Sequence, residues 1–122
     1  MKGTQMRIFR RLLMIISVVA LVTMPTLIGT ASAEVSSDVA AKLLRIAKCE
    51  SGLRPDAVSS SGKYHGLFQF DQRTWNATAK RAKRTDLVGV KPSQAHELNQ
   101  IFLALELFEQ RGTQPWPVCG KR

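Results

Sequence analysis

The sequence predicts a small α+β domain that is mainly helical and carries one short hairpin and one disulfide. Apolar residues recur at helical spacing in residues 37–50 and again in residues 93–111. Serines and a glycine at residues 59–62 separate two short apolar clusters, a pattern that indicates the turn of a hairpin. Only two cysteines, Cys49 and Cys119, are present, and in an exported chain such a pair is typical of one disulfide.

Residues 1–33 have the pattern of a cleavable signal peptide. Four basic residues precede an almost unbroken apolar run, Pro25 breaks that run, and Ala31-Ser32-Ala33 forms a small-residue cleavage site. The alternative is an uncleaved membrane anchor, because the apolar run and the weakly polar residues after it are nearly long enough to span a bilayer. The helix breaker and the cleavage site favour the signal peptide. We therefore expect a secreted or cell-wall-associated protein whose single domain comprises residues 34–122.

This domain is small and depends on its disulfide. The 122 residues less the 33 of the signal segment leave 89, which gives little room for a hydrophobic core. Closing a loop of about 70 residues removes roughly 4 kcal/mol of unfolded-chain entropy by the simple polymer argument. A zinc site is not expected, because His65 and His96 lie far from any paired-ligand spacing.

The chain is basic, with 18 Lys and Arg against 9 Asp and Glu. Removing the four basic residues of the signal segment leaves 14 against 9, a net charge of +5. Much of the excess lies at residues 80–84 and at Lys91. Export argues against nucleic acid as a partner, so attraction to a polyanionic cell envelope is the more natural use. The alternative is a solvated helix face that only aids solubility.

The first helix places a glutamate on its own apolar face. It should run from Ser37 to Glu50, with Ser36 or Ser37 as N-cap and Gly52 as its stop. Its apolar stripe leads directly to Glu50 and consists of Val39, Leu43, Ile46 and Ala47. Desolvation and the negative end of the helix dipole both raise the pKa of a carboxyl group in that place. A carboxylic acid still protonated near neutral pH is what cleavage of a glycosidic bond requires, whereas a helix that turned Glu50 outward would leave an ordinary solvated acid.

Three further segments complete the predicted domain. A short, irregular hairpin is expected between Ala57 and Phe70, followed by a second helix from about Asp71 towards Lys83. The third helix should be capped by Ser93 and end by Gly112. Its predicted apolar stripe consists of Ala95, Leu98, Ile101, Phe102, Leu105 and Phe108. The tail, residues 115–119, is too rich in proline for a helix and should pack as an extended segment pinned by its cysteine.

Four short motifs occur together in the chain. They are Cys49-Glu50-Ser51-Gly52, Gly66-Leu67-Phe68-Gln69-Phe70, Thr74-Trp75 and Trp116-Pro117-Val118-Cys119-Gly120. In combination they resemble the catalytic domain of the actinobacterial resuscitation-promoting factors, within the wider superfamily of lysozyme-like lytic transglycosylases. The resemblance covers about residues 39–120. It implies a lysozyme-like fold that acts on bacterial peptidoglycan and a role in wall remodelling and growth resumption.

The resemblance also implies roles for single residues. Glu50 matches the family's catalytic glutamate, and Gln69 matches the glutamine that lines its sugar cleft. Trp75 matches the tryptophan that follows in the same block, while Cys49 and Cys119 match the disulfide pair that would hold the tail beside Glu50.

Further candidates for substrate binding come from residue type. Tyr64 and Trp75 have flat faces suited to stacking on sugars, although aromatic residues are more often part of a core, and Trp75 is expected to be at least partly core. His65 is expected at the surface next to the cleft. Asp71 is a further candidate, but the preferred interpretation is that it caps the second helix.

The expected reaction is cleavage between N-acetylmuramic acid and N-acetylglucosamine, with Glu50 as the acid and then the base and a 1,6-anhydro product. A muramidase-type hydrolase of the inverting kind needs a second carboxylate, for which Asp56 and Asp71 are the candidates. Two non-enzymatic interpretations stand beside these: a module that binds wall sugar without cleaving it, and a signalling protein. No metal or organic cofactor is expected. The expected partners are the peptidoglycan glycan strand and another cell-wall hydrolase, and the protein should be a monomer.

Overall fold

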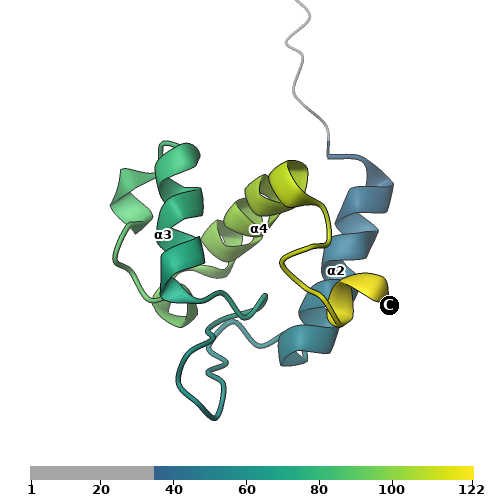
Figure 1. Ribbon diagram of the computed structural model, residues 1–122, viewed down its shortest axis with the longest axis horizontal. Coiled ribbons are helices and arrows are strands. Elements are labelled where there is room, and N and C mark those ends of the chain that lie inside the picture. Colours follow the sequence, from purple (N-terminus) through teal and green to yellow (C-terminus); the bar gives the residue numbers. More distant parts are fainter. Residues whose placement is uncertain (1–34) are drawn as a thin grey trace, which may run out of the picture. The chain divides into compact units, whose positions relative to one another are not determined.

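The computed structural model describes residues 35–122, so the predicted signal peptide lies outside the described residues. Three α-helices and three short 3-10 helices make up this part of the chain (Figure 1). They are α2 (Ser37–Ser51), α3 (Gln72–Arg81), η1 (Thr85–Leu87), η2 (Pro92–Gln94), α4 (Glu97–Arg111) and η3 (Cys119–Lys121). Within residues 35–122, no helix has both the length and the apolar character needed to cross a membrane.

The predicted fold class is confirmed, with the hairpin reduced to its minimum. Among residues 35–122 the only β-structure is two isolated antiparallel bridges, Val58 with His65 and His65 with Phe70. His65 therefore pairs on both sides, and the loop from Gly66 to Gln69 turns back on itself between the two bridges. The result is a small, mainly helical domain with one disulfide, consistent with the lysozyme-like architecture that the motifs imply.

Helix α2 begins and ends where its sequence predicts. The side chain of Ser36 accepts a hydrogen bond from the Val39 amide at 3.3 Å, which identifies Ser36 as the N-cap. Gly52 ends the helix in the left-handed conformation, with φ of 64°. Between them, Leu43, Ile46 and Ala47 are buried in the core, as the apolar stripe predicts.

Helix α3 is capped by Asp71, which confirms the preferred interpretation of this residue. The carboxylate accepts the Thr74 amide at 2.9 Å and the Thr74 hydroxyl at 2.8 Å. Trp75 and Ala79, on the inner face, are completely buried. The helix ends at Arg81, and the chain turns at Lys83, whose φ is 56°.

The predicted start of α4 is wrong, and its predicted apolar stripe is confirmed only in part. The helix begins at Glu97 with His96 as its N-cap, because residues 92–94 form the separate η2 turn and Ala95 is extended, with ψ of 147°. Its fully buried face consists of Gln100, Leu103, Ala104 and Leu107, whereas four residues of the predicted apolar stripe are partly buried against this core: Ala95, Phe102, Leu105 and Phe108. Leu98 and Ile101, which belong to that stripe, are 64% and 43% exposed.

Gln100 explains why α4 turns a different face to the core than its apolar residues predict. Its buried side chain forms hydrogen bonds to three other segments. Its Oε1 accepts the Leu67 amide at 2.8 Å, and its Nε2 donates to the carbonyls of Pro55 and Ala95 at 3.0 and 2.9 Å. A side chain at Gly66 would collide with Gln100 Oε1, and the φ of Gly66 is +81°. The helix therefore presents an amide to the core where the loops have backbone groups that need partners.

We predict that Gln100→Met destabilises the domain by about 2–4 kcal/mol, because methionine keeps the volume but leaves three backbone groups without partners. Urea unfolding measures the difference. The matched control is Gln94→Met, at an exposed position whose side chain makes no hydrogen bond within residues 35–122; it should change the stability by less than about 0.5 kcal/mol. Equal stability of the two variants would contradict the role given to Gln100.

Candidate active site

Glu50 lies in the last full turn of α2, one residue before the end of the helix. Its side chain is partly buried, and this burial raises the pKa of the carboxyl group above its ordinary value. The end of the helix is locked by Ser51, whose hydroxyl donates to the Ala47 carbonyl at 3.1 Å and accepts the Arg54 amide at 3.2 Å. The acid is therefore held at a fixed point on a rigid helix end.

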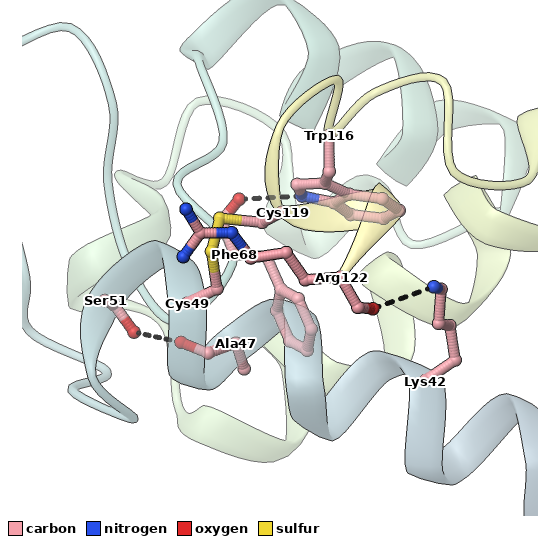
Figure 2. The surroundings of a disulfide bond; sticks show 8 residues. All are labelled: Lys42, Ala47, Cys49, Ser51, Phe68, Trp116, Cys119 and Arg122. Carbon is pink, nitrogen blue, oxygen red and sulfur yellow. Dashed lines mark hydrogen bonds between the residues drawn. A yellow bond between two sulfur atoms is a disulfide. The ribbon is translucent and has the colours of Figure 1, made fainter.

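The C-terminal tail is fastened to this helix end. Cys49, next to Glu50, forms a disulfide with Cys119, and the α-carbons of the pair are 5.6 Å apart (Figure 2). Helix η3 consequently packs beside α2, as Figure 1 shows for the yellow end of the chain. Lys42 adds a hydrogen bond from its Nζ to the carbonyl of Arg122 at 3.0 Å.

The tail is also fastened to the loop of residues 66–70. The indole nitrogen of the buried Trp116 donates to the Phe68 carbonyl at 3.0 Å (Figure 2). The Phe68 and Trp116 rings pack at 6.1 Å between centroids. In this loop Gln69 has a φ of 52°, a left-handed conformation that is costly for a residue with a side chain. Its amide nitrogens, main-chain and side-chain, both donate to the Gly66 carbonyl, at 3.2 and 3.0 Å.

These three segments line a cavity of about 310 Å³, and Glu50 is the only carboxylate that the described part of the chain, residues 35–122, contributes to it. Its lining residues are Glu50, Tyr64, Gln69, Pro115, Trp116, Pro117, Val118 and Cys119. Tyr64 and Val118 are 39% and 64% exposed, so both offer surface to a ligand. The chemistry available is that of one carboxyl group with a raised pKa beside aromatic and amide groups.

The cavity continues as a groove towards α3 and α4. A neighbouring stretch of about 370 Å³ shares Tyr64, Gln69 and residues 115–117 with it. That stretch in turn shares Asp71, Thr74, Leu107 and Arg111 with a third one of about 590 Å³. A long polymer could therefore lie across the acid and continue along the helices.

Tyr64 and Gln69 are the predicted binding residues that lie beside Glu50. Asp71 lines the groove further along. Burial there acts to raise the pKa of its carboxyl group, but the hydrogen bonds from Thr74 and the Arg73 amide and the charge of Lys63 together outweigh burial, so the pKa is lowered. The carboxylate is thus ionised at neutral pH and already occupied as a helix cap.

Trp75 and His65 serve the fold instead. Trp75 is fully buried and donates its indole N–H to the Leu87 carbonyl at 2.8 Å, so it has no face for a sugar. The prediction that His65 lies at the surface is wrong, because its ring is buried. Both of its nitrogens are hydrogen-bonded, to the Ser93 hydroxyl at 3.1 Å and to the Gly62 carbonyl at 3.0 Å.

The tail supplies lining residues that the sequence did not single out: Pro115, Pro117 and Val118. A usable signal was present, because a disulfide between Cys49 and Cys119 places the residues just before Cys119 next to Glu50. Among residues 35–122, no three or more His, Cys, Asp or Glu side chains gather as metal ligands would.

Residues 36–119 match the model of the transglycosylase-like domain family. Resuscitation-promoting factor RpfC of Mycobacterium tuberculosis is 37% identical over 75 residues, which is 62% of this chain and 47% of RpfC. Probable transglycosylase SceD 3 of Staphylococcus saprophyticus is 35% identical over 81 residues, which is 66% of this chain and 32% of the relative.

Resuscitation-promoting factor RpfE of Mycobacterium tuberculosis is 32% identical over 77 residues, 63% of this chain and 40% of RpfE. The matched region thus spans less than half the length of each of these relatives. No solved structure matches the chain significantly. The resemblance inferred from the four motifs is confirmed.

We predict that Glu50→Gln makes the domain more stable than the wild type at pH 7 but not at pH 3. Burial raises the pKa of Glu50 in the folded state, so the wild type loses stability as the pH rises from the unfolded-state pKa through the folded-state pKa. Glutamine cannot ionise and avoids this loss. The melting temperature at both pH values measures the effect. Glu109→Gln, at an exposed position of α4, controls for the loss of one charge, and an equal gain in both variants would contradict the prediction.

Proposed function

The chain belongs to the transglycosylase-like domain family, and on that premise we propose that it cleaves the glycan strand of bacterial peptidoglycan. The bond cleaved is the one between N-acetylmuramic acid and N-acetylglucosamine. The observation that carries the proposal is a single carboxyl group with a raised pKa, Glu50, in a cavity that opens into a long groove.

Glu50 acts first as the acid and then as the base. In its protonated form it donates its proton to the glycosidic oxygen, and the bond from the muramic acid carbon to that oxygen breaks. The positive charge that develops on the sugar is stabilised as an oxocarbenium ion or by the sugar's own acetamido oxygen. The Glu50 carboxylate then removes the proton of the muramoyl 6-hydroxyl, whose oxygen closes onto the same carbon. The product is a 1,6-anhydro sugar, no water is consumed, and Glu50 ends protonated.

The carboxylates of the groove favour this route over hydrolysis. An inverting hydrolase needs a second carboxylate roughly 6.5–9.5 Å from the acid to activate water. Among residues 35–122, Glu50 is the only carboxylate that lines its cavity, and Asp71, in the next stretch, has both oxygens engaged by Thr74. Asp56 is not among the residues that line the cavity.

The biological setting proposed is the cell wall. Cleavage of peptidoglycan requires the domain outside the cytoplasmic membrane, which agrees with the signal-like pattern of residues 1–33. Two relatives are named resuscitation-promoting factors, and a role in wall remodelling and growth resumption is proposed on that similarity. A second wall hydrolase that processes the products is the proposed partner.

We predict that purified peptidoglycan treated with the protein releases 1,6-anhydro-muramoyl products, whereas treatment with Glu50→Gln releases none. The amide that this substitution introduces can neither donate nor accept the proton as the acid does. Mass spectrometry of the released muropeptides distinguishes the anhydro product from a reducing end by the mass of one water. Glu109→Gln serves again as the matched control and should keep full activity. Reducing ends would make the protein a hydrolase, and no products from the wild type would contradict cleavage itself.

Gln69→Gly separates the role of this side chain in substrate binding from the backbone strain that a non-glycine residue causes at this position. Glycine adopts the left-handed backbone of residue 69 without strain, so we expect unchanged or slightly higher stability. Loss of an amide that contacts the sugar should lower kcat/KM by about tenfold. Thermal melts and muropeptide release measured on the same preparation test both parts. Full activity of the variant would exclude Gln69 from substrate binding.

A further inference from the structure

The end of the groove that lies furthest from Glu50 is cationic. This third stretch, of about 590 Å³, is the largest of the three, and four basic residues and one acidic residue line it. The basic residues are Lys63, Arg73, Arg81 and Arg111, and the acidic one is Asp71, whose carboxylate caps α3. Only Arg81 belongs to the basic cluster that is evident in the sequence, so the fold assembles this surface from separate segments.

Helix α3 forms one wall of this stretch in a regular way. Arg73, Ala77 and Arg81 all line it and are spaced four residues apart, so they lie along one face of the helix. The small side chain of Ala77 leaves room between the two arginines. Helix α4, which packs against α3, supplies Gln110 and Arg111 from its last turn.

Within residues 35–122, the side chains of the arginines of this stretch make no ion pair and no hydrogen bond. Within residues 35–122 the one ion pair is between Arg84 and Asp86, outside the groove. The side chains of Arg73, Arg81 and Arg111 make no hydrogen bond to any other described residue, in contrast to Arg84, which makes three. Lys63 is partly engaged, since its Nζ lies 5.3 Å from the centre of the Tyr64 ring.

The lining chemistry differs from that of a sugar subsite. No aromatic side chain of the described residues lines the cationic stretch, whereas Tyr64 and Trp116 line the cavity of Glu50. Planar guanidinium groups match carboxylate oxygens in pairs, which a neutral sugar hydroxyl cannot exploit. Along α3 from Thr74 to Arg81 the distance is about 10 Å by helical rise, which about three extended peptide residues cover.

We propose that this cationic stretch binds the carboxylates of a peptide stem attached to the glycan strand, and so makes the protein select peptide-bearing strands over peptide-free ones. The inference rests on the proposed function for the position of the strand in the groove. The stems are covalently attached to muramic acid, so a strand seated at Glu50 delivers them along the same continuous groove. The stem carboxylates then replace water on guanidinium groups that have no partner among residues 35–122.

Binding, rather than cleavage, is the readout that keeps this inference separable from the proposed activity. The full chain is titrated by calorimetry with glycan fragments that carry peptide stems and with the same fragments after an amidase has removed them, both free of teichoic acid. We expect the wild type to bind the peptide-bearing fragments about tenfold more tightly. In Arg73→Gln/Arg81→Gln the ratio of the two dissociation constants should fall to near one. We expect each exposed arginine to contribute a factor of about three to the wild-type ratio.

The matched control is Lys80→Gln/Lys83→Gln, which removes the same charge from residues at and just after the end of α3 that do not line the groove. This control should keep the wild-type ratio, and a wild-type ratio that declines with added salt would support ion pairing. Equal binding of the two fragments by the wild type, or equal effects of the two double variants, would overturn the inference. Teichoic acid that binds to the wild type more tightly than the stems do would overturn it in favour of a phosphodiester ligand.

Discussion

The attachment of the C-terminal tail to the end of α2 is the constraint on which the rest of the structure depends. The Cys49–Cys119 disulfide joins residues 70 positions apart, and the Trp116 indole extends the attachment to the Phe68 carbonyl. One tail thereby holds both the helix that carries Glu50 and the loop that carries Gln69. Without it, Glu50 would be far more exposed to solvent in the last turn of α2, because the tail supplies most of the residues that line its cavity. Burial causes the raised pKa of Glu50, and the tail that lines the cavity contributes to this burial.

The same loop is also held by hydrogen bonds from the side chain of Gln100. The buried side chain of Gln100 connects the 66–70 loop to residues 55 and 95 through three hydrogen bonds, so the loop is held by a covalently attached tail and by a polar side chain of α4. These two attachments, to the tail and to Gln100, account for the left-handed conformation of Gln69. Such a costly backbone conformation persists only where the surrounding structure holds it in place. In this small domain the disulfide and the Gln100 hydrogen bonds both lie close to the site, and they hold the segments that line the groove. Aromatic residues and prolines line one end of this groove, and arginines line the other.

The sequence predicted the parts that depend on local signals and missed those that depend on long-range polar contacts. The caps Ser36, Gly52 and Asp71 could be predicted because their interactions are made within three or four residues. The position of Glu50 followed from helical periodicity, and the disulfide from the cysteine count. Periodicity missed Gln100 of α4, because this residue is buried for hydrogen bonds to groups 5, 33 and 45 residues away, which no local pattern records. His65 was misplaced for the same reason, because its bond to Ser93 spans 28 residues.

The most direct test of this account is the pKa of Glu50 itself, measured by NMR from the titration of its side-chain carboxyl carbon. The oxidised wild type should give a value clearly above that of an ordinary glutamate, and the value should fall back towards the ordinary range in the Cys49→Ser/Cys119→Ser variant, in which the tail is released. An unshifted pKa in the wild type, or the same raised pKa in a folded variant without the disulfide, would contradict the claim that the attached tail raises the pKa of Glu50.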